Sequence, residues 1–231
     1  MRLDAGHLGR MLDVSAVRTD VELEEVRQLA ETCRQLGCIC AFVMPCYMAA
    51  LKELLAGTPE VKLGGVIGFP SGAVTTATKR EEVRQQRELG ASELDCVINV
   101  GMLRSGCDAY VEDDLGGVVE AAGGIPVKVI LEAHYLTDEE IRRGSRIAVG
   151  AGAAFVKTGT GWAPTGATLH NVRLIKSVVG DAAGVKAAGG VRDLQTIVDM
   201  IRLGVNRFGI GLKSCRAVFD ELAALPAGIE I

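Results

Sequence analysis

The sequence has few aromatic residues, and this lack limits how its core can be built. Phe, Trp and Tyr make up only 4% of the 231 residues, although 48% are hydrophobic and 29 are Gly. The core must therefore consist of aliphatic side chains, with many tight turns between elements. That composition is typical of buried parallel strands joined by helices.

Long hydrophobic runs and an excess of basic residues are also lacking. No apolar stretch reaches the roughly 18 residues of a membrane-spanning helix, and the first residues do not resemble a signal peptide. The 25 Lys and Arg are balanced by 29 Asp and Glu, and no basic run could follow a phosphate backbone. We expect a soluble, cytoplasmic protein with a small-molecule partner, and neither nucleic acid nor a membrane.

The sequence contains no Cys-x-x-Cys pair, and its seven cysteines are an odd number. Cys38, Cys40 and Cys96 fall in segments that we predict to be strands, where a reduced thiol packs as a small hydrophobic group. With Cys33 and Cys46, some of these could be considered as metal ligands, but alternate strand residues face opposite sides of a sheet. We therefore expect no disulfide framework and no metal.

Eight apolar segments alternate with amphipathic ones along the whole chain. The amphipathic segments, such as residues 20–36 and 79–89, repeat their apolar positions every three or four residues, as helices do. Repeated strand and helix units form right-handed crossovers, and eight of them close a barrel. We predict a single α/β domain over residues 1–231, a (β/α)8 TIM barrel. The expected strands are residues 11–17, 38–44, 63–68, 93–100, 127–132, 154–158, 184–188 and 207–211.

Lys128, Lys157 and Lys186 occur in similar short apolar runs, each 29 residues from the next. That interval is one strand and helix unit, so neighbouring strands would bring the three ammonium groups into one interior. Burial and like charge both lower the pKa of a lysine, and a neutral buried lysine is a nucleophile toward carbonyl groups. The pattern therefore predicts Schiff-base chemistry.

Lys157 is the predicted nucleophile, because it follows an apolar segment and precedes the turn Thr158–Gly161, in which Thr158 and Thr160 support the site. Lys186 would lower the pKa of Lys157, and Asp95, in the fourth predicted strand, would transfer protons. Lys128 lies one layer deeper and would pair with Asp95. The alternative for any single lysine is a structural role, in which the stem packs and the amine reaches water.

Two glycine-bearing turns are candidates for anion binding. Gly189, Gly190 and Arg192 precede a predicted helix, whose amides and dipole would favour an anion. Gly209, Gly211 and Lys213 follow the eighth predicted strand, where barrels often bind phosphate. Gly161 would contribute to the same site. His134 follows the fifth strand at the mouth of the barrel, whereas the other two histidines are more typical of surface groups.

Several segments in order resemble the class I deoxyribose-phosphate aldolases, over about residues 11–221. The resemblance implies a (β/α)8 barrel and reversible addition of acetaldehyde to an aldehyde acceptor, without a cofactor. It also implies that Lys157 forms the imine and that Lys186 and Asp95 assist proton transfer. The matching segments are residues 66–72 (VIGFPSG), 93–99 (ELDCVIN), 128–132 (KVILE), 155–161 (FVKTGTG) and 185–190 (VKAAGG).

The sequence departs from this family mainly where substrate would be held. Ala188, Gly211 and Leu212 stand where the family usually has hydroxyl side chains, so phosphate should be held less tightly. Phe42 and Met44 replace smaller or polar residues, which predicts a bulkier and more apolar acceptor pocket.

We conclude from the sequence that the chain is a Schiff-base aldolase for a 2-deoxyribose 5-phosphate-like β-hydroxy aldehyde, with acetaldehyde as donor. The sequence is also compatible with a homo-oligomer. Two alternatives stay open. One is an aldolase for an unphosphorylated, ketone or keto-acid substrate, and the other is a barrel that binds anions without turnover.

Overall fold

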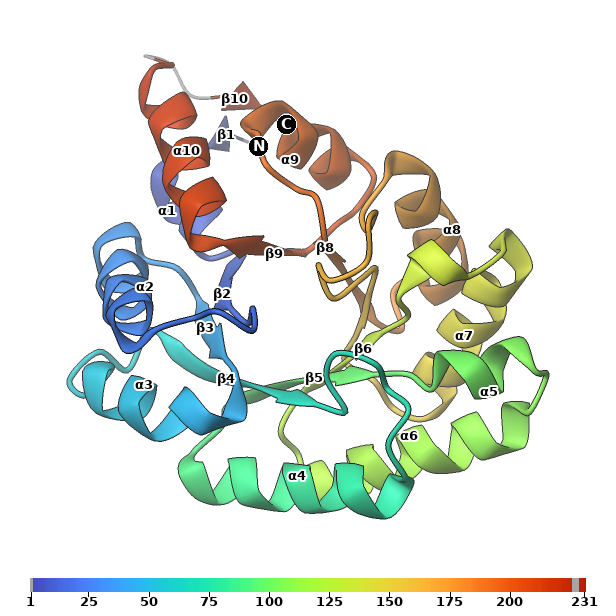
Figure 1. Cartoon of the computed structure of the whole chain (residues 1–231). Coiled ribbons are helices and arrows are strands. Elements are labelled where there is room, and N and C mark those ends of the chain that lie inside the picture. Colours follow the sequence, from blue (N-terminus) through green and yellow to red (C-terminus); the bar gives the residue numbers. More distant parts are fainter. Residues whose placement is uncertain (1, 226–228) are drawn as a thin grey trace.

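A computed structural model describes residues 2–225 and 229–231, and its centre is a closed barrel of eight parallel strands. Figure 1 shows the helices as a ring around these strands. The (β/α)8 fold predicted from the sequence is confirmed. The barrel strands are β2 (Leu12–Ala16), β3 (Cys40–Val43), β4 (Lys62–Ile67), β5 (Glu93–Val97), β6 (Val127–Ile130), β7 (Phe155–Lys157), β8 (Gly184–Ala188) and β9 (Arg207–Gly211).

Ten α-helices and two short 3-10 turns connect the strands within the described residues. The short strands β1 (Arg2–Leu3) and β10 (Ile229–Glu230) form a separate antiparallel pair beside α9 and α10 (Figure 1). The helices are α1 (Ala5–Gly9), α2 (Leu23–Leu36), α3 (Met48–Leu54), α4 (Thr76–Leu89), α5 (Val100–Arg104), α6 (Asp108–Ala122), α7 (Asp138–Gly150), α8 (Leu169–Val179), α9 (Leu194–Arg202) and α10 (Leu212–Ala223), and the turns are η1 (Pro45–Tyr47) and η2 (Ala133–Tyr135).

All eight predicted strands are present, but three of them differ from the prediction by two or more residues at one end, for local reasons. β3 starts only at Cys40, because Cys38 still bonds back to α2 through Cys33. β5 ends at Val97, because the Asn99 side chain caps α5. β6 ends at Ile130, because Glu132 has a left-handed backbone with φ 53°.

The strand register places the predicted site residues side by side. Lys128 on β6 is the register partner of Asp95 on β5, and Lys157 on β7 is the partner of Lys186 on β8. Paired residues of parallel neighbours face the same side of a sheet, and here that side is the barrel interior. The interval of 29 residues therefore places the three lysines in one interior, as predicted from the sequence.

The described cysteines are all free thiols, as expected. Asp13, Cys40 and Glu93 place their ligand atoms within 4.8 Å of one another. Their chemistry does not fit a metal, however, because burial and the Asp13 carboxylate raise the pKa of the Cys40 thiol well above its usual range. Cationic side chains also contact both carboxylates, Lys128 and Arg207 each pairing with Asp13 and with Glu93.

No helix in the described ranges, residues 2–225 and 229–231, is both long enough and apolar enough to cross a membrane.

Candidate active site

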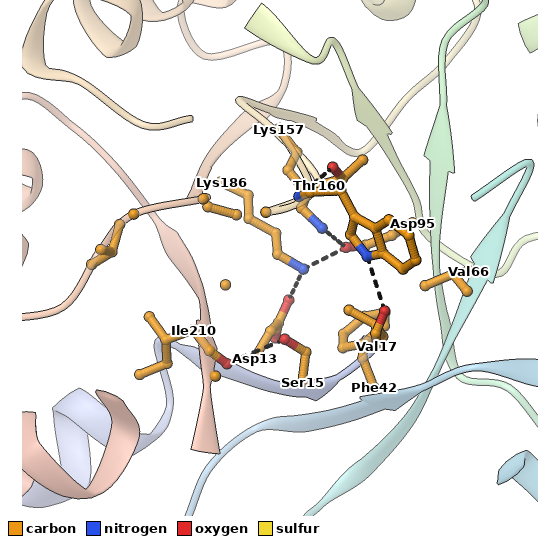
Figure 2. A pocket seen from close by; sticks show the side chains of 18 of the residues that line it. Asp13, Ser15, Val17, Phe42, Val66, Asp95, Lys157, Thr160, Lys186 and Ile210 are labelled. Atoms are coloured by element: carbon orange, nitrogen blue, oxygen red, sulfur yellow. Dashed lines mark hydrogen bonds and ion pairs between the residues drawn. The ribbon is translucent and has the colours of Figure 1, made fainter. Parts of the chain in front are cut away.

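A cavity of about 220 Å³ opens at the carboxyl ends of the barrel strands, and Figure 2 shows it at close range. This is the end at which (β/α)8 barrels place their chemistry. Lys157, Lys186 and Asp95 all line it, as the sequence predicts. The other predicted residues that line it are Phe42, Thr160, Gly161, Gly189, Gly190, Arg192, Gly209 and Gly211.

Lys157 is the last residue of β7, and its side chain points into the cavity. Its Nζ donates to Asp95 Oδ2 over 2.6 Å. Burial lowers the pKa of this amine to about 8, and the Lys186 charge acts in the same direction, while Asp95 opposes both. Lys157 therefore loses its proton near pH 8, well below the ordinary range of a lysine, and its neutral form can attack a carbonyl carbon.

Asp95 joins the two cations at the mouth of the barrel. Its Oδ2 accepts from both Lys157 and Lys186, each over 2.6 Å. Burial alone would raise the pKa of Asp95, but the neighbouring lysines outweigh this effect and hold the pKa well below its usual range. The other oxygen, Oδ1, makes no hydrogen bond to the described residues. One carboxylate oxygen thus connects the candidate nucleophile to a second buried ammonium group.

Lys128 lies one layer deeper, as the sequence predicts, but its main partners are not those expected. Its Nζ lies 2.7 Å from Asp13 Oδ2 and also contacts Glu93, whereas Asp95 Oδ1 is 3.6 Å away. Burial would lower the pKa of Lys128, but Asp13 and Asp95 raise it well above its usual range. Burial and like charge, which lower the pKa of a lysine, are therefore outweighed by the carboxylates at Lys128.

Asp13, Glu93 and Arg207 complete this deeper layer, and the sequence analysis missed their roles. Arg207 Nη1 donates to Asp13 Oδ1 over 2.6 Å and to Glu93 Oε2 over 3.3 Å. Despite burial, Lys186 and Lys128 lower the pKa of Asp13 to about 2. One feature of the sequence could have revealed them: each is a charged residue inside or at the start of an apolar strand segment, where burial requires a partner of opposite charge.

The charges of the buried network explain why Lys157 is the lysine that becomes neutral. Without Lys157, three cations face three carboxylates, so the network is balanced. Protonated Lys157 would add one uncompensated positive charge in a buried site. Lys62 also contacts Glu93, but its side chain is 39% exposed and water compensates its charge. The balanced set is Lys128, Lys186, Arg207, Asp13, Glu93 and Asp95.

The predicted acceptor residues lie in different places. The Phe42 ring lies below the ammonium groups of Lys186, 4.3 Å away, and Lys128, 4.8 Å away, so it forms the floor of the cavity. Met44 packs beside Phe42 but does not line the cavity. His134 is exposed, bonds to Thr165 and also lies outside the lining. Met44 and His134, for which an acceptor role was predicted, thus do not contact the cavity.

The apolar wall of the cavity comes from four residues that the sequence analysis did not assign to it. They lie in or after three different strands, β2, β4 and β7, so no local pattern reveals that they meet. These residues are Val17, Val66, Phe69 and Trp162.

The turn that follows Lys157 is fixed to neighbouring strands. Thr158 is buried and does not line the cavity, because its hydroxyl donates to the Ala188 carbonyl oxygen over 2.7 Å and accepts from Ala188 N. Thr160 lines the cavity and bonds to Glu132. Gly161 has φ 88°, which favours glycine. Thr158 therefore holds β7 against β8, while Thr160 and Gly161 face the substrate space.

Hydrogen-bond donors gather on the opposite side of the cavity. Gly189 and Gly190 have φ 84° and 98°, and Arg192 has no bonded or ionic partner among the described residues. The helix after this turn, α9, differs from the expectation. Asp193 and Glu221 occupy its amino-terminal amides over 2.8 and 2.7 Å, so this helix end is not free for an anion.

The amino terminus of α10, unlike that of α9, is free of a side-chain cap. Gly211 caps α10 without a side-chain hydrogen bond, and Ser214 in the first turn lines the cavity with a hydroxyl that has no partner among the described residues. Lys213 is exposed and faces an adjacent groove, so it does not supply charge to the cavity. Leu212 is buried. Arg192, the Gly189–Gly190 turn and the start of α10 therefore lie together on this side of the cavity, where they could donate hydrogen bonds to an anion.

Comparisons with known proteins point to one family. A family model described as DeoC/LacD family aldolase matches residues 4–221. The deoxyribose-phosphate aldolase of Klebsiella pneumoniae is 47% identical over 219 residues, which are 94% of this chain and 88% of the relative. That of Rhizobium meliloti is 44% identical over 96% of this chain and 89% of its own length.

Solved structures agree with these relatives. A putative deoxyribose-phosphate aldolase from Coccidioides immitis superimposes with a TM-score of 0.92, at 31% identity, over 97% of this chain and 88% of that one. The enzyme of Aeropyrum pernix, described as tetrameric, superimposes with a TM-score of 0.87, at 30% identity, over 96% of this chain and 94% of that one.

Proposed function

Because the chain belongs to the DeoC/LacD family of aldolases, a family of carbon–carbon lyases, we propose that it is a class I aldolase for 2-deoxyribose 5-phosphate. It would cleave this sugar phosphate to acetaldehyde and glyceraldehyde 3-phosphate, and catalyse the reverse addition. One observation carries the proposal. Lys157 is a buried amine with its pKa lowered to about 8, and it faces the cavity 2.6 Å from Asp95.

Lys157 acts as the nucleophile in this proposal. The neutral amine attacks the aldehyde carbon, and the carbinolamine loses water to give an iminium ion. The C3 hydroxyl then loses its proton, the bond between C2 and C3 breaks, and its electrons move into the iminium as an enamine. Protonation of the enamine carbon and hydrolysis release acetaldehyde and restore the amine.

Asp95 and Lys186 move the protons in these steps. Asp95 is held ionised, so it accepts a proton only transiently, and Lys186 can resupply it through the shared oxygen Oδ2. Lys128 and its carboxylate partners keep this pair in place from below. The roles divide the network into a reacting layer at the mouth and a supporting layer beneath.

The phosphate of the substrate would lie against the donors on the β8 and β9 side. Arg192 supplies a charge, while the Gly189 and Gly190 amides and the free start of α10 supply hydrogen bonds. The hydroxyl of Ser214 offers one further donor at this place. Support comes from the amino terminus of α10, which has no acidic residue in its first turn and no side-chain cap, whereas Asp193 and Glu221 cap the amino terminus of α9.

Borohydride trapping tests the proposal. Acetaldehyde and borohydride together should add the mass of an ethyl group at Lys157, because reduction converts the imine to a stable amine. The Lys157→Ala protein should show no adduct, and Lys186→Ala serves as the matched control that retains the nucleophile. An adduct that maps to Lys186, or that persists in Lys157→Ala, would disprove the assignment.

A homo-oligomer is also part of the proposal. Its support is the Aeropyrum pernix relative, which is described as tetrameric. Light scattering after size exclusion would give the mass of the particle, and a mass of one chain at all concentrations would contradict it. The single-domain and cytoplasmic assignments made from the sequence stay predictions.

A further inference from the structure

The ring of Phe42 lies inside the barrel beside two ammonium groups. Lys186 Nζ lies 4.3 Å from the centroid of this ring, and Lys128 Nζ lies 4.8 Å from it. Phe42 is only 2% exposed, so water has little access to the ring. The face of an aromatic ring attracts a cation within about 6 Å, and the attraction is stronger where both groups are removed from water. Phe42 therefore interacts with the lysines as well as forming the floor of the cavity.

The neighbouring strand β4 leaves room for this ring. Gly64 is the register partner of Phe42, and a Cβ on Gly64 would lie 2.5 Å from Phe42 Cε1. Any larger residue at position 64 would therefore displace the ring. Val66, two residues further along the same strand, packs in one apolar cluster with Phe42. The ring is thus held at a fixed place under the ammonium groups.

Lys157 and Lys186 share one carboxylate oxygen at the mouth of the barrel. Asp95 Oδ2 lies 2.6 Å from the Nζ atom of each lysine, and Figure 2 shows this oxygen between the two amines. The buried network is balanced when one of these two lysines is neutral. The contact with Asp95 is the same for both, so it does not decide which of them gives up its proton.

Two further neighbours favour the charged form of Lys186. Its Nζ lies 2.7 Å from Asp13 Oδ2, but Lys128 and Arg207 pair with the same carboxylate. The second neighbour is the Phe42 ring. Lys157 has neither of these neighbours among the described residues. Because Asp13 is divided among three cations, the ring adds a preference that Asp13 supplies only in part.

The other charged or titratable groups around Lys186 belong to the deeper layer. They are Lys128, Arg207, Glu93 and Cys40. Burial raises the pKa of the Cys40 thiol well above its usual range, so this group is neutral. On β4 the facing residues, Gly64 and Val66, are uncharged. Two cations thus stand against one carboxylate in this set, and apart from Asp13 the deeper layer gives Lys186 no net attraction.

We propose that Phe42 is a positioning residue that keeps a proton on Lys186 and so leaves Lys157 as the neutral amine. The ring stabilises an ammonium group but not a neutral amine, so it acts only on the charged form of Lys186. Charged Lys186 in turn favours loss of the proton from Lys157. This inference rests on the proposed function, since it concerns the amine that forms the imine.

Ring fluorination tests the proposal and keeps the shape of the side chain. Phenylalanine with one, two or three ring fluorines at position 42 removes negative charge from the ring face in steps. Imine formation with acetaldehyde is trapped by borohydride over a range of pH, and the parent midpoint is expected near pH 8. Each fluorine should move this midpoint further to higher pH, because Lys186 holds its proton less firmly.

Phe42→Leu removes the ring and keeps the site apolar. The midpoint of imine formation should rise by about 0.5 pH unit or more, and the rate at pH 8 should fall by about twofold. The direction is that expected for loss of the Lys186 charge, because a proton then stays on Lys157 to higher pH. The fluorinated series decides the question if Phe42→Leu does not fold.

Phe155 is the matched control, because its ring faces the cations of the deeper layer in the same way. The ring centroid lies 5.9 Å from Lys128 Nζ and 5.5 Å from Arg207 Cζ. A Cβ on its register partner Gly184 would lie 2.4 Å from Phe155 Cδ1. Neither cation shares a carboxylate oxygen with Lys157. Fluorination at position 155 should therefore leave the midpoint within about 0.2 pH unit of the parent.

A double variant separates an effect through Lys186 from a general disturbance of the cavity. In Lys186→Leu the ring has lost the ammonium group of the mouth, so adding Phe42→Leu should move the midpoint no further. A second shift as large as that in the parent would overturn the inference.

The outcomes also separate the inference from the proposed function. Imine at Lys157 with a midpoint that does not respond to fluorination at position 42 would overturn the inference and leave the proposed function standing. Equal shifts from fluorination at positions 42 and 155 would likewise overturn it. No imine at Lys157 in the parent would overturn both.

Discussion

The mouth and the deeper layer of the barrel contain lysines in similar sequence contexts, with opposite acid–base behaviour. Lys157 at the mouth has one carboxylate within hydrogen-bond distance, and burial lowers its pKa to about 8. Lys128 on the adjacent strand β6 contacts two carboxylates, Asp13 and Glu93, and its pKa is raised. The number of carboxylates around a buried lysine, rather than burial itself, decides which lysine becomes a nucleophile.

The largest expected effect comes from removing the nucleophile at the mouth of the barrel and leaving the deeper layer unchanged. Lys157→Met should lower turnover of 2-deoxyribose 5-phosphate by a factor of about 10⁴ or more, because no other amine replaces the nucleophile. The free energy of unfolding should stay within about 1 kcal/mol of the parent or rise, because the change removes an uncompensated buried cation. Steady-state rates and urea unfolding measure the two quantities. Retention of more than a few per cent of the activity would contradict the role of Lys157.

The deeper layer should respond in the opposite way. Lys128→Met removes one of the three buried cations that balance Asp13, Glu93 and Asp95, so one buried negative charge is left uncompensated and unfolding should become easier by about 3–5 kcal/mol. Lys62→Met is the matched control, since Lys62 contacts the same Glu93 but is 39% exposed, and its loss should cost less than about 1 kcal/mol. Urea unfolding of both variants decides it. Equal stability of the two would show that the deeper layer is not a supporting network.

Asp95 connects the two layers, and its loss should affect proton transfer more than imine formation. Asp95→Asn keeps the shape but removes the base, so turnover should fall by a factor of about 10² or more. Imine trapped by borohydride should survive in part. Near-normal turnover in this variant would end the proton-transfer role.

A smaller effect is expected on the phosphate side of the mouth. We expect kcat/KM for 2-deoxyribose 5-phosphate to exceed that for 2-deoxyribose by less than about 10³, because the usual hydroxyl donors are lacking. Gly211→Ser should raise this ratio, by an amount equal to roughly 1.5–3 kcal/mol of transition-state binding, because it adds one hydroxyl donor to the phosphate. The serine fits without strain, since a Cβ at Gly211 meets nothing within 4 Å.

Gly211→Ala fills the same space without a hydroxyl and is the control for this change. An unchanged ratio in Gly211→Ser, or a parent ratio above the stated bound, would show that Arg192, Ser214 and the backbone amides already form a complete phosphate site. Leu212 is not a useful position for a second serine, because its side chain is buried.

The sequence could predict the barrel and the reacting lysines because both depend on periodicity. An interval of 29 residues equals one strand and helix, so Lys157 and Lys186 had to become register partners. Aliphatic strand segments located all eight barrel strands, and the place of Asp95 in the fourth of them located this carboxylate in the barrel. These features are local or repeated, so they can be read along the chain.

Contacts across the barrel could not be read in this way. Asp13 and Lys128 are 115 positions apart, and Arg207 and Asp13 are 194 apart, so no local pattern pairs them. The capping of α9 by Glu221, 27 positions from Leu194, was missed for the same reason. Met44 was placed in the pocket because it replaces a residue of the aldolase family, and His134 because it follows a strand, and neither fact fixes the direction of a side chain.

The pH dependence of imine formation at Lys157 tests the central claim most directly. Short incubations with acetaldehyde at different pH values, each stopped in one borohydride buffer, would keep the reduction step constant. Only the neutral amine attacks, so the rate should rise with pH and reach half its maximum near pH 8, where Lys157 loses its proton. Lys186→Leu removes a neighbouring positive charge and should move this midpoint to higher pH. A parent midpoint near the ordinary lysine value of about 10.4, or a midpoint that Lys186→Leu does not change, would contradict the account.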